Sequence, residues 1–448
     1  MNNHYSEKND STIIIRVMCA IVFVLFSWGW LYFFQADALA MTQHVLSDGL
    51  THYNRFVGAL IITAVLMILQ SIVNGVTKLN KRFHALTYLP SMLVLAMLTG
   101  VSQSIDHEVK LSSSIWLVIF FLIVWVVLVF LARQYQDLKK NIPYPFFSRP
   151  MWMNMLVLVL MISCVAWIGN TNAVFQYRMK VEGYLMRGEY QKALKVGKKS
   201  LESDADLLML RMYALARCEE MGEHLFEYPI TGNSLDVLPT NGRTRMLFYP
   251  ADSLYKFMGA RPAVEMEPQR YLAMLLRRDS VNSKAIADYI LCSFLIDKQL
   301  DLFAKEISHY YTIDAHLPKF YREALTLYTH SRSNPVVVLR VPVMEEDYAN
   351  YQELKRQYQD PMEQNTRVSE EYRGTYWYYF EYEQPKKLSD DWRAFLLGLF
   401  IEVSFDRFLR CLLKLLFMDF YLGDFLVGRN HLVQSVTVLF HDVLQIFL

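Results

Sequence analysis

One short stretch near the middle of the chain gathers side chains that can bind metal ions. It brings a thiol, carboxylates and an imidazole together in the order Cys218-Glu219-Glu220-Met221-Gly222-Glu223-His224. Zinc sites in proteins use cysteines and histidines at recurring spacings, which this stretch lacks. Because Cys218 falls on the apolar face of a predicted helix and the acids fall at its end, we interpret the stretch as a helix terminus and predict no metal site.

Two histidines further along flank an acid, with His309 and His316 on either side of Asp314. A metal or catalytic role would need further partners that the sequence does not identify, so we interpret both histidines as surface or core residues. The sequence contains no GxSxG, P-loop, GxGxxG or HExxH pattern. We therefore predict no catalytic residue and no cofactor, and we favour a protein that is not an enzyme, although a lone serine or aspartate nucleophile stays open.

The cysteines carry no redox or zinc motif, because none of the five forms a CxxC pair. Cys19 and Cys164 lie in apolar blocks and read as small hydrophobic residues. Cys218 and Cys292 lie in the part of the chain that we predict to be exported, where oxidation can join thiols. Both have apolar helical surroundings, so free thiols are favoured and a disulfide between them is the alternative.

The composition indicates that part of the chain lies in a membrane and part in water. Of the 448 residues, 53% are apolar and yet 20% are charged. A wholly embedded chain carries fewer charges, and a wholly aqueous one carries fewer long apolar runs. The formal net charge is +1, so no overall field attracts nucleic acid, and we expect none as a partner.

Five apolar blocks within residues 1–169 are candidate transmembrane helices. A span needs about 20 apolar residues, because the hydrocarbon core of a bilayer is about 30 Å thick. The blocks are Ile13–Phe34, Phe56–Val76, His84–Val101, Ile115–Ala132 and Met151–Gly169. The third block is the weakest, because it contains Pro90. We predict an N-terminal transmembrane helix bundle of about five spans, with membrane lipids as its surroundings.

The basic residues of the short loops predict the orientation of this bundle. If five spans alternate, one side carries Lys8, Arg16, Lys78, Lys81, Arg82, Arg133, Lys139, Lys140 and Arg149. The short loops of the other side carry only Arg55 and Lys110. By the positive-inside rule the N-terminus is cytoplasmic, and the region after Gly169 lies outside. In a bacterium this is a multi-pass inner-membrane protein with a periplasmic domain.

Polar residues inside the predicted spans are few. None of the spans has an ionisable residue near its centre, which disfavours a transporter because ion and proton pathways use such groups. Gln70, Ser71 and Asn74 form a polar patch on the second span. We interpret this patch as hydrogen bonding between helices, with a substrate-lining role as the alternative.

Residues 170–384 have the period of a helical-repeat domain. Two similar motifs, Gly188-Glu189-Tyr190 and Gly222-Glu223-His224, lie one tetratricopeptide repeat of 34 residues apart. The glycine of such a motif permits a tight turn between two helices. The second unit is degenerate, because Pro229 cuts its second helix short. We predict a degenerate tetratricopeptide-like domain, so the whole chain is all-α.

Three segments depart from this helical period. Residues 228–263 are rich in proline and glycine and read as an irregular loop that includes a short helix, Ala251–Met258. Val336–Val343 is a β-branched run that we interpret as one extended segment. Residues 385–448 are apolar but interrupted by charges, which predicts a tail of amphipathic helices.

The densest aromatic stretch of the chain precedes this tail and includes Tyr376, Trp377 and Tyr379. Stacked aromatic rings can bind a peptide, a protein or a glycan, so these three residues are candidate partner-binding residues. The alternative is that they belong to a terminal helix that caps the helical array and packs on it, or on the membrane surface.

The chain resembles a family of polytopic bacterial membrane proteins with a tetratricopeptide-like exported domain and no assigned activity. The resemblance covers residues 10–383 and rests on the stretches Tyr32–Asp37, Thr51–Arg55, Asp288–Cys292, Leu317–Leu325 and Gly374–Tyr379. It implies no activity, so it carries no functional residues over to this chain. The tail after residue 384 lies outside the pattern.

Two functions fit these observations. The first is a membrane-anchored interaction or scaffold protein whose helical domain docks a protein or peptide partner in the cell envelope. The second is a membrane enzyme or transfer factor that acts on a lipid-linked or glycan substrate, with its site between the bundle and the 228–263 loop.

Overall fold

The computed structural model describes residues 3–47, 49–51, 53–80, 82–100, 115–138, 149–170, 172–278 and 283–383. The chain divides into two units, Met1–Pro385 and Lys386–Leu448, and every described residue belongs to the first. The predicted tail at 385–448 lies outside the described residues. Within the described part of the chain all regular secondary structure is helical, as the sequence predicts.

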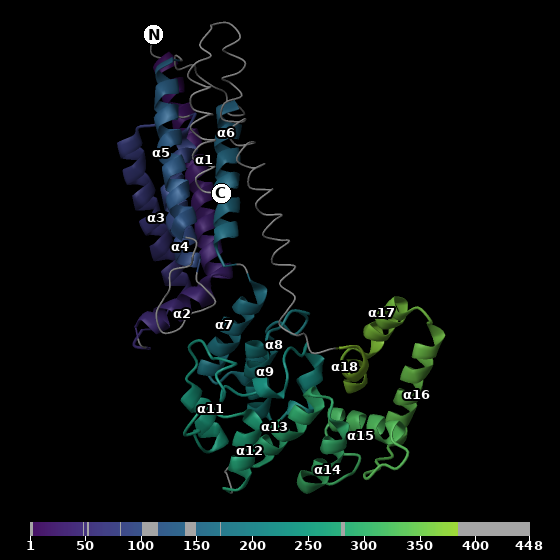
Figure 1. Cartoon of the computed structure of the whole chain (residues 1–448). Helices are drawn as coiled ribbons and strands as arrows, with labels where there is room; N and C mark the ends of the chain where they lie inside the picture. Colours follow the sequence, from purple (N-terminus) through teal and green to yellow (C-terminus); the bar gives the residue numbers. More distant parts are fainter. Residues whose placement is uncertain are drawn as a thin grey trace. The chain divides into compact units, whose positions relative to one another are not determined.

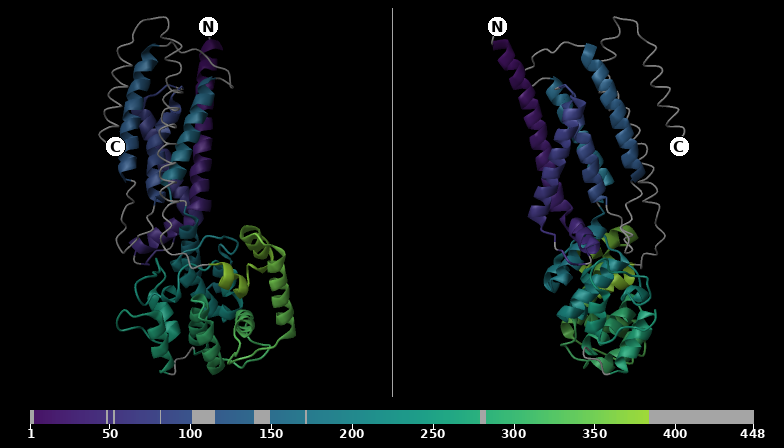
Figure 2. Two further views of the ribbon diagram at one scale, coloured as in Figure 1. Left: turned by 45° about the vertical axis from the view of Figure 1, so that its right-hand side comes forward. Right: turned by 90° about the vertical axis from the view of Figure 1, so that its left-hand side faces the viewer.

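The first group of helices forms a bundle in which α1, α3, α4, α5 and α6 run side by side (Figures 1 and 2). Its elements are α1 (Asn3–Gly29), the π-helical turn η1 (Trp30–Phe34), α2 (Ala36–Leu46), α3 (Arg55–Thr77), η2 (His84–Tyr88), α4 (Leu89–Thr99), α5 (Ile115–Leu138) and α6 (Arg149–Ile168). The helix α2 differs from the others, because it packs against α7 of the second group.

Three helices of this bundle are long and apolar enough to cross a membrane, where the sequence predicted about five. They are Ile13–Phe34, Arg55–Thr77 and Pro150–Ile168. Two shorter apolar helical stretches, His84–Thr99 and Val118–Gln134, lie beside them. The third predicted span is short because Pro90 stands in the first turn of α4, and the residues before it form a 3-10 turn. Proline lacks an N–H group and is tolerated only at such a helix start.

The burial pattern of α3 is typical of a helix surrounded by lipid. Its buried residues recur at helical spacing and are mostly small or polar: Ala59, Thr63, Leu66, Gln70 and Thr77. Its exposed residues are large and apolar: Phe56, Val57, Leu60, Ile61, Val65, Ile68, Ile72 and Val76. A helix in water exposes its polar face. The outward apolar face of α3 therefore supports a membrane position for the bundle.

Hydrogen bonds between side chains and backbone join the bundle helices. Gln70 of the predicted polar patch donates from Nε2 to Thr87 Oγ1 at 3.0 Å, which is the interhelical bond that we expected for this patch. Ser71 instead donates to the carbonyl of Met67 in its own helix. Asn154 of α6 donates to the carbonyl of Arg82 and accepts the N–H of Ala85. Such bonds keep polar groups satisfied where no water reaches them.

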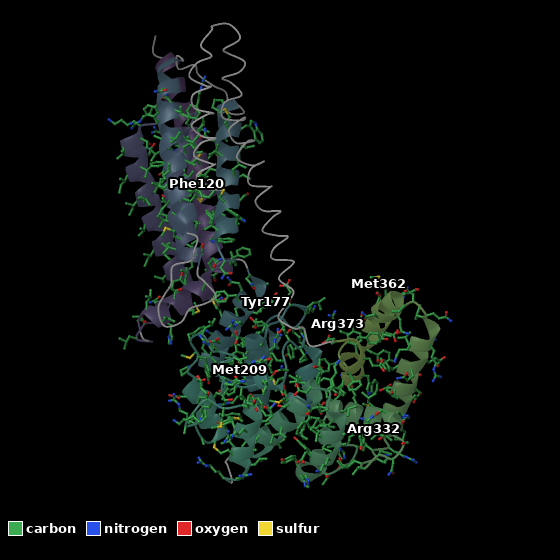
Figure 3. The ribbon with its side chains drawn as sticks, viewed as in Figure 1. Phe120, Tyr177, Met209, Arg332, Met362 and Arg373 are labelled. Atoms are coloured by element: carbon green, nitrogen blue, oxygen red, sulfur yellow. The ribbon has the colours of Figure 1, made fainter. Side chains whose placement is uncertain are left out.

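The second group of helices, the helical domain, packs around one large hydrophobic core. Its elements are α7 (Ala173–Met186), α8 (Tyr190–Lys195), α9 (Ala205–Cys218), α10 (Met221–His224), η3 (Leu225–Glu227), η4 (Ser234–Asp236), α11 (Ala251–Met258), α12 (Pro268–Leu276), α13 (Ser283–Ile296), α14 (Leu300–Tyr310), α15 (Lys319–Ser331), α16 (Pro342–Gln357), α17 (Pro361–Tyr372) and α18 (Tyr376–Tyr382). Met209 of α9 is fully buried in this core, whereas Met362 of α17 is 80% exposed (Figure 3).

Three turns between consecutive helices share one geometry. Gly188, Glu219 and Lys298 each have a positive φ, of 70°, 60° and 59°. At each turn this residue donates its N–H three residues back, and the next residue donates five residues back, which is a Schellman closure. Gly222 does not take this conformation. It lies inside α10, where a Cβ would approach Cβ of Pro318 to 2.6 Å. The two glycines that are 34 residues apart therefore have different structural roles.

The proline- and glycine-rich loop at 228–263 packs on the domain instead of extending from it. It contains the predicted helix α11 with the bounds expected from the sequence. Tyr228, Val237, Leu238 and Tyr249 are buried in the same core as the surrounding helices. The loop is therefore a structural part of the helical domain.

Candidate functional site

The three candidate partner-binding residues lie in the hydrophobic core. Tyr376, Trp377 and Tyr379 are 0%, 1% and 2% exposed. The indole of Trp377 packs edge-on against Tyr348, and the ring of Tyr379 packs against Phe226. A partner would reach these rings only if α18 moved away. Their assignment to partner contact stays a prediction, and this packing favours the alternative of a closing helix that packs on the array.

Two charged side chains, one on α15 and one in the turn between α13 and α14, hold the ends of α18. At its N-terminus the carboxylate of Glu323 accepts the N–H of Tyr376 at 2.6 Å, and the carbonyl of Glu323 accepts Nε1–H of Trp377 at 2.8 Å. At its C-terminus Nζ of Lys298 donates to the carbonyls of Phe380 and Glu383. An anion at the start and a cation at the end of a helix both complement its dipole. We call this arrangement the α18 clasp.

The carboxylate of the α18 clasp titrates near neutral pH. Glu323 is 2% exposed, and burial raises its pKa to about 7. Lys319, whose Nζ lies 3.8 Å from the carboxylate, and Arg322 oppose this rise, as does the N–H of Tyr376. Asp347 adds to it. The charge of the clasp carboxylate therefore changes with pH in the neutral range.

A second buried acid, Asp288 of α13, is held by two tyrosines. Its carboxylate accepts the hydroxyl protons of Tyr311 at 2.6 Å and Tyr321 at 2.8 Å. The thiol of Cys292 lies 3.6 Å from the Tyr321 hydroxyl. Burial raises the pKa of the Cys292 thiol well above its usual range, so it is not a nucleophile. The buried polar groups of this cluster bond to one another, so we interpret the cluster as part of the structural core.

The metal-capable stretch at 218–224 is used for surface and turn contacts. Glu219 pairs with Lys284 at 2.8 Å, and His224 Nδ1 lies 2.9 Å from Glu227. Cys218 and Cys292 are both free thiols. His309 and His316 are exposed, and no three metal-binding side chains come together in the part of the chain that the structure describes.

A third buried acid, Glu182 of α7, anchors the loop at 228–263. Its carboxylate is fully buried and accepts the N–H groups of Leu247, Phe248 and Tyr249 at 2.8 to 3.0 Å. Burial raises the pKa of Glu182, and the three N–H groups and Arg178 oppose that rise. We call this arrangement the Glu182 anchor.

The Glu182 anchor fixes the point where the helical domain touches the bundle. Leu247 and Phe248 of the anchored loop pack on a small cluster formed by Ala38, Met41, Phe175 and Met179. The imidazole of His44 on α2 lies 5.8 Å from the ring of Phe248. The helix α2 therefore rests on α7 and on the anchored loop. A single glutamate on an otherwise ordinary helix gave no sequence signal for this junction.

Two exposed valines lie in the connection between α15 and α16, and a third lies in the first turn of α16. Val336, Val338 and Val343 are 80%, 47% and 65% exposed. Arg332, labelled in Figure 3, starts this connection. It pairs with Asp301 through two short contacts. The other exposed large hydrophobic residues of the described part of the helical domain lie singly, at Met186, Leu201, Val264, Leu302 and Met362. We call residues 335–341 the valine segment.

Comparison with known proteins gives a family without an assigned activity. Residues 258–383 match a family of unknown function, DUF6057. Neither the curated proteins nor the solved structures gave a match to the chain. The matched region contains α12 to α18, with the α18 clasp and the valine segment, and the bundle lies outside it. This confirms the expected resemblance to an uncharacterised family for that region.

Proposed function

We propose that the protein is a membrane-anchored docking protein whose helical domain binds a protein or peptide partner in the cell envelope. In this proposal the bundle crosses the inner membrane five times, with α4 and α5 as the shorter spans. The N-terminus is cytoplasmic and the helical domain periplasmic. The recurring turns at Gly188, Glu219 and Lys298 support a degenerate tetratricopeptide-like array.

One observation carries this proposal. The acids Glu182, Asp288 and Glu323 are all engaged in holding the helical domain together. Among the exposed large hydrophobic residues of the described helical domain, Val336, Val338 and Val343 are the ones that lie close together in the chain. Exposed apolar residues that lie together on a protein surface mark interaction sites, whereas single ones are ordinary. A docking surface explains why they are grouped.

In-cell photocrosslinking tests the proposal. A photoreactive amino acid is placed in turn at Val336, Leu201 and Val264, all of which are exposed. We expect a discrete crosslinked protein from Val336 and none from the two control positions. If none of the three positions yields a protein crosslink, the docking function is wrong.

The contact between the anchored loop and α2 favours a second candidate, a membrane enzyme or transfer factor. Leu247 and Phe248 bring the 228–263 loop to the bundle, where a lipid-linked or glycan substrate would be handled. Arg178 and Asp206 form a 2.8 Å ion pair beside that loop, and Asp206 accepts the N–H of Arg245. Crosslinks from Phe248 to lipid or glycan, with no protein crosslinks from Val336, would place this candidate first.

A further inference from the structure

The valine segment leaves its backbone hydrogen-bonding groups open. The chain is extended at Arg332, where α15 ends, and again at Val341, where α16 begins, with bends at 333–334 and 336–337 between them. The N–H of Val336 donates to the hydroxyl of Tyr328 at 3.3 Å, and the carbonyl of Val341 accepts the first bond of α16. Between them, the N–H and carbonyl groups of residues 337–340 have no protein partner among the described residues.

Side-chain burial alternates along the same residues. Leu339 is 5% exposed and packs in the core, with Val337 and Val341 packed partly against it. Val338 and Arg340 point to the exposed side. Period-two alternation is the pattern of a strand with one buried face. The segment is not a β-strand of the described structure, but it has the burial alternation of one. The backbone groups of residues 337–340 stay unpaired among the described residues, so this edge of the segment is open.

Only a second extended polypeptide matches an open strand edge, because its own N–H and carbonyl groups recur at the same spacing. The exposed side chains of the valine segment indicate which side chains the bound polypeptide would place opposite them. Val338 is apolar, and the guanidinium of Arg340 has no ion-pair partner among the described residues. An acidic side chain opposite Arg340 would supply that partner.

We propose that the valine segment binds an extended peptide of a partner protein as an added strand, with apolar side chains facing Val338 and an acidic side chain facing Arg340. This inference rests on the proposed docking function and names the chemistry of its partner. A second copy of this chain is a poorer occupant. Antiparallel pairing of two copies about Val338 places Arg340 opposite Val336, so both guanidinium groups stay unpaired.

Fluorescence anisotropy with two defined peptides tests the proposal on the full-length protein in lipid nanodiscs. The probes are fluorescein-labelled hexapeptides of alternating valine and threonine with one central residue, glutamate in one and lysine in the other. We expect the glutamate peptide to bind about fivefold more tightly, the upper range for an exposed ion pair. Methylation of alternate amide nitrogens in the glutamate peptide should weaken binding about tenfold or more, because it removes strand hydrogen bonds.

Matched variants locate the site. Arg340→Glu should reverse the preference, so that the lysine peptide binds more tightly. Val338→Thr keeps the shape of the side chain and should weaken both peptides, whereas Val264→Thr, at a more exposed valine elsewhere, should change neither. Unchanged near-ultraviolet circular dichroism shows that each variant is folded.

Three results with the peptides would overturn the proposal. They are the absence of saturable binding by the glutamate peptide, binding that amide methylation leaves intact, and a preference that Arg340→Glu does not alter. A Val338→Cys chain that forms disulfide-linked dimers faster than Val264→Cys would show a second copy at the edge, which also overturns it. If the peptides fail while photocrosslinking from Val336 still captures one protein, docking stands and only strand addition is wrong.

Discussion

The helices α3 and α9 show how the same kinds of residue are used in opposite ways in the two regions of this protein. On α3 the large apolar side chains face outward and a stripe of small and polar residues faces the bundle. On α9 nearly every residue from Leu207 to Ala216 is buried, including Arg211. The difference follows from the surroundings. Lipid favours outward apolar side chains, and water drives them inward.

The two regions also differ in which buried polar groups they contain and in how these groups are hydrogen-bonded. In the bundle, Gln70 donates to the hydroxyl of Thr87, and Asn154 of α6 donates to the carbonyl of Arg82 and accepts the N–H of Ala85. In the helical domain, the acids Glu182, Asp288 and Glu323 are buried and each accepts bonds from two or more donors, or from a helix start. Buried charge is costly unless it is satisfied in this way. The helical domain is therefore sensitive to changes at a few charged positions, and the bundle to changes of its outward face.

The largest effect is expected from a buried ring of the helical domain. Trp377→Ala should lower the free energy of unfolding of this domain by about 3–5 kcal/mol, because it leaves a cavity and removes the bond to the Glu323 carbonyl. The measurement is denaturant unfolding of the full chain in detergent, followed by labelling of the buried Cys292 thiol. The matched control is Trp152→Ala on α6, whose ring is 64% exposed. Equal losses in both variants would contradict the contrast between the regions.

The second largest effect is expected from a charge placed on the outward face of the bundle. Ile68 lies in the middle of α3 and is 61% exposed. If lipid surrounds it, Ile68→Lys should cost about 3 kcal/mol of insertion free energy. Val264→Lys, at a position of the helical domain that is 69% exposed, should change stability by no more than about 0.5 kcal/mol. The measurement is the fraction of full-length chain inserted into bilayers, and normal insertion of the Ile68 variant would show that α3 does not face lipid.

The third effect concerns the junction between the regions. Glu182→Gln should destabilise the anchored loop by about 2 kcal/mol. All three N–H groups of the loop reach Oε2, and a neutral amide oxygen accepts them less strongly than a carboxylate oxygen does, while the amide NH2 group would replace Oε1, which also accepts from Leu247. Hydrogen exchange should then rise about thirtyfold at Leu247, Phe248 and Tyr249. Glu265→Gln is the control, since Glu265 lies exposed in the same loop region. Unchanged exchange at these three amides would show that other contacts hold the loop.

The smallest effect, measured per pH unit, is a dependence of stability on pH. The pKa of Glu323 is about 7 in the folded protein against 4.5 for an ordinary glutamate, so the folded state binds the proton more tightly. Stability is therefore greatest below pH 4.5 and is lost as pH rises towards 7, by about 1 kcal/mol per pH unit from this group. Glu323→Gln should remove that slope between pH 5 and 7 in denaturant unfolding. A slope that persists in the variant would assign it to Asp288, Asp206 or Glu182 instead, whose pKa values are also raised.

Local sequence patterns predicted the helices well, but they predicted the turns and packing contacts between helices poorly. The bounds of α11 follow from its flanking Pro250 and Gly259, and the all-helical class follows from period alone. The repeat motif at Gly222 predicted a turn between helices that the structure does not have there. A glycine needed for close packing on Pro318 looks the same in sequence as one needed for a turn. Glu219 and Lys298 take the left-handed turn conformation without being glycine, so the sequence does not reveal it.

The aromatic stretch at 376–382 shows what sequence leaves open about a candidate site. Its composition predicts a helix of rings, and the same rings would suit either a binding surface or a core. Only the tertiary structure brings Glu323 and Lys298 to the two ends of α18, from positions 53 and 82 residues away in the chain. Burial is a property of those distant contacts, so it could not be derived locally.

By itself the sequence determined which parts of this chain are helical and which are apolar enough to leave water, because period and hydropathy depend on neighbouring residues. The tertiary structure decided which faces are buried, where the acids Glu182, Asp288 and Glu323 find their donors, and that the valine segment keeps an open edge. These depend on contacts between residues far apart in the chain. Their free energy comes from removing particular surfaces from water, which no local pattern specifies.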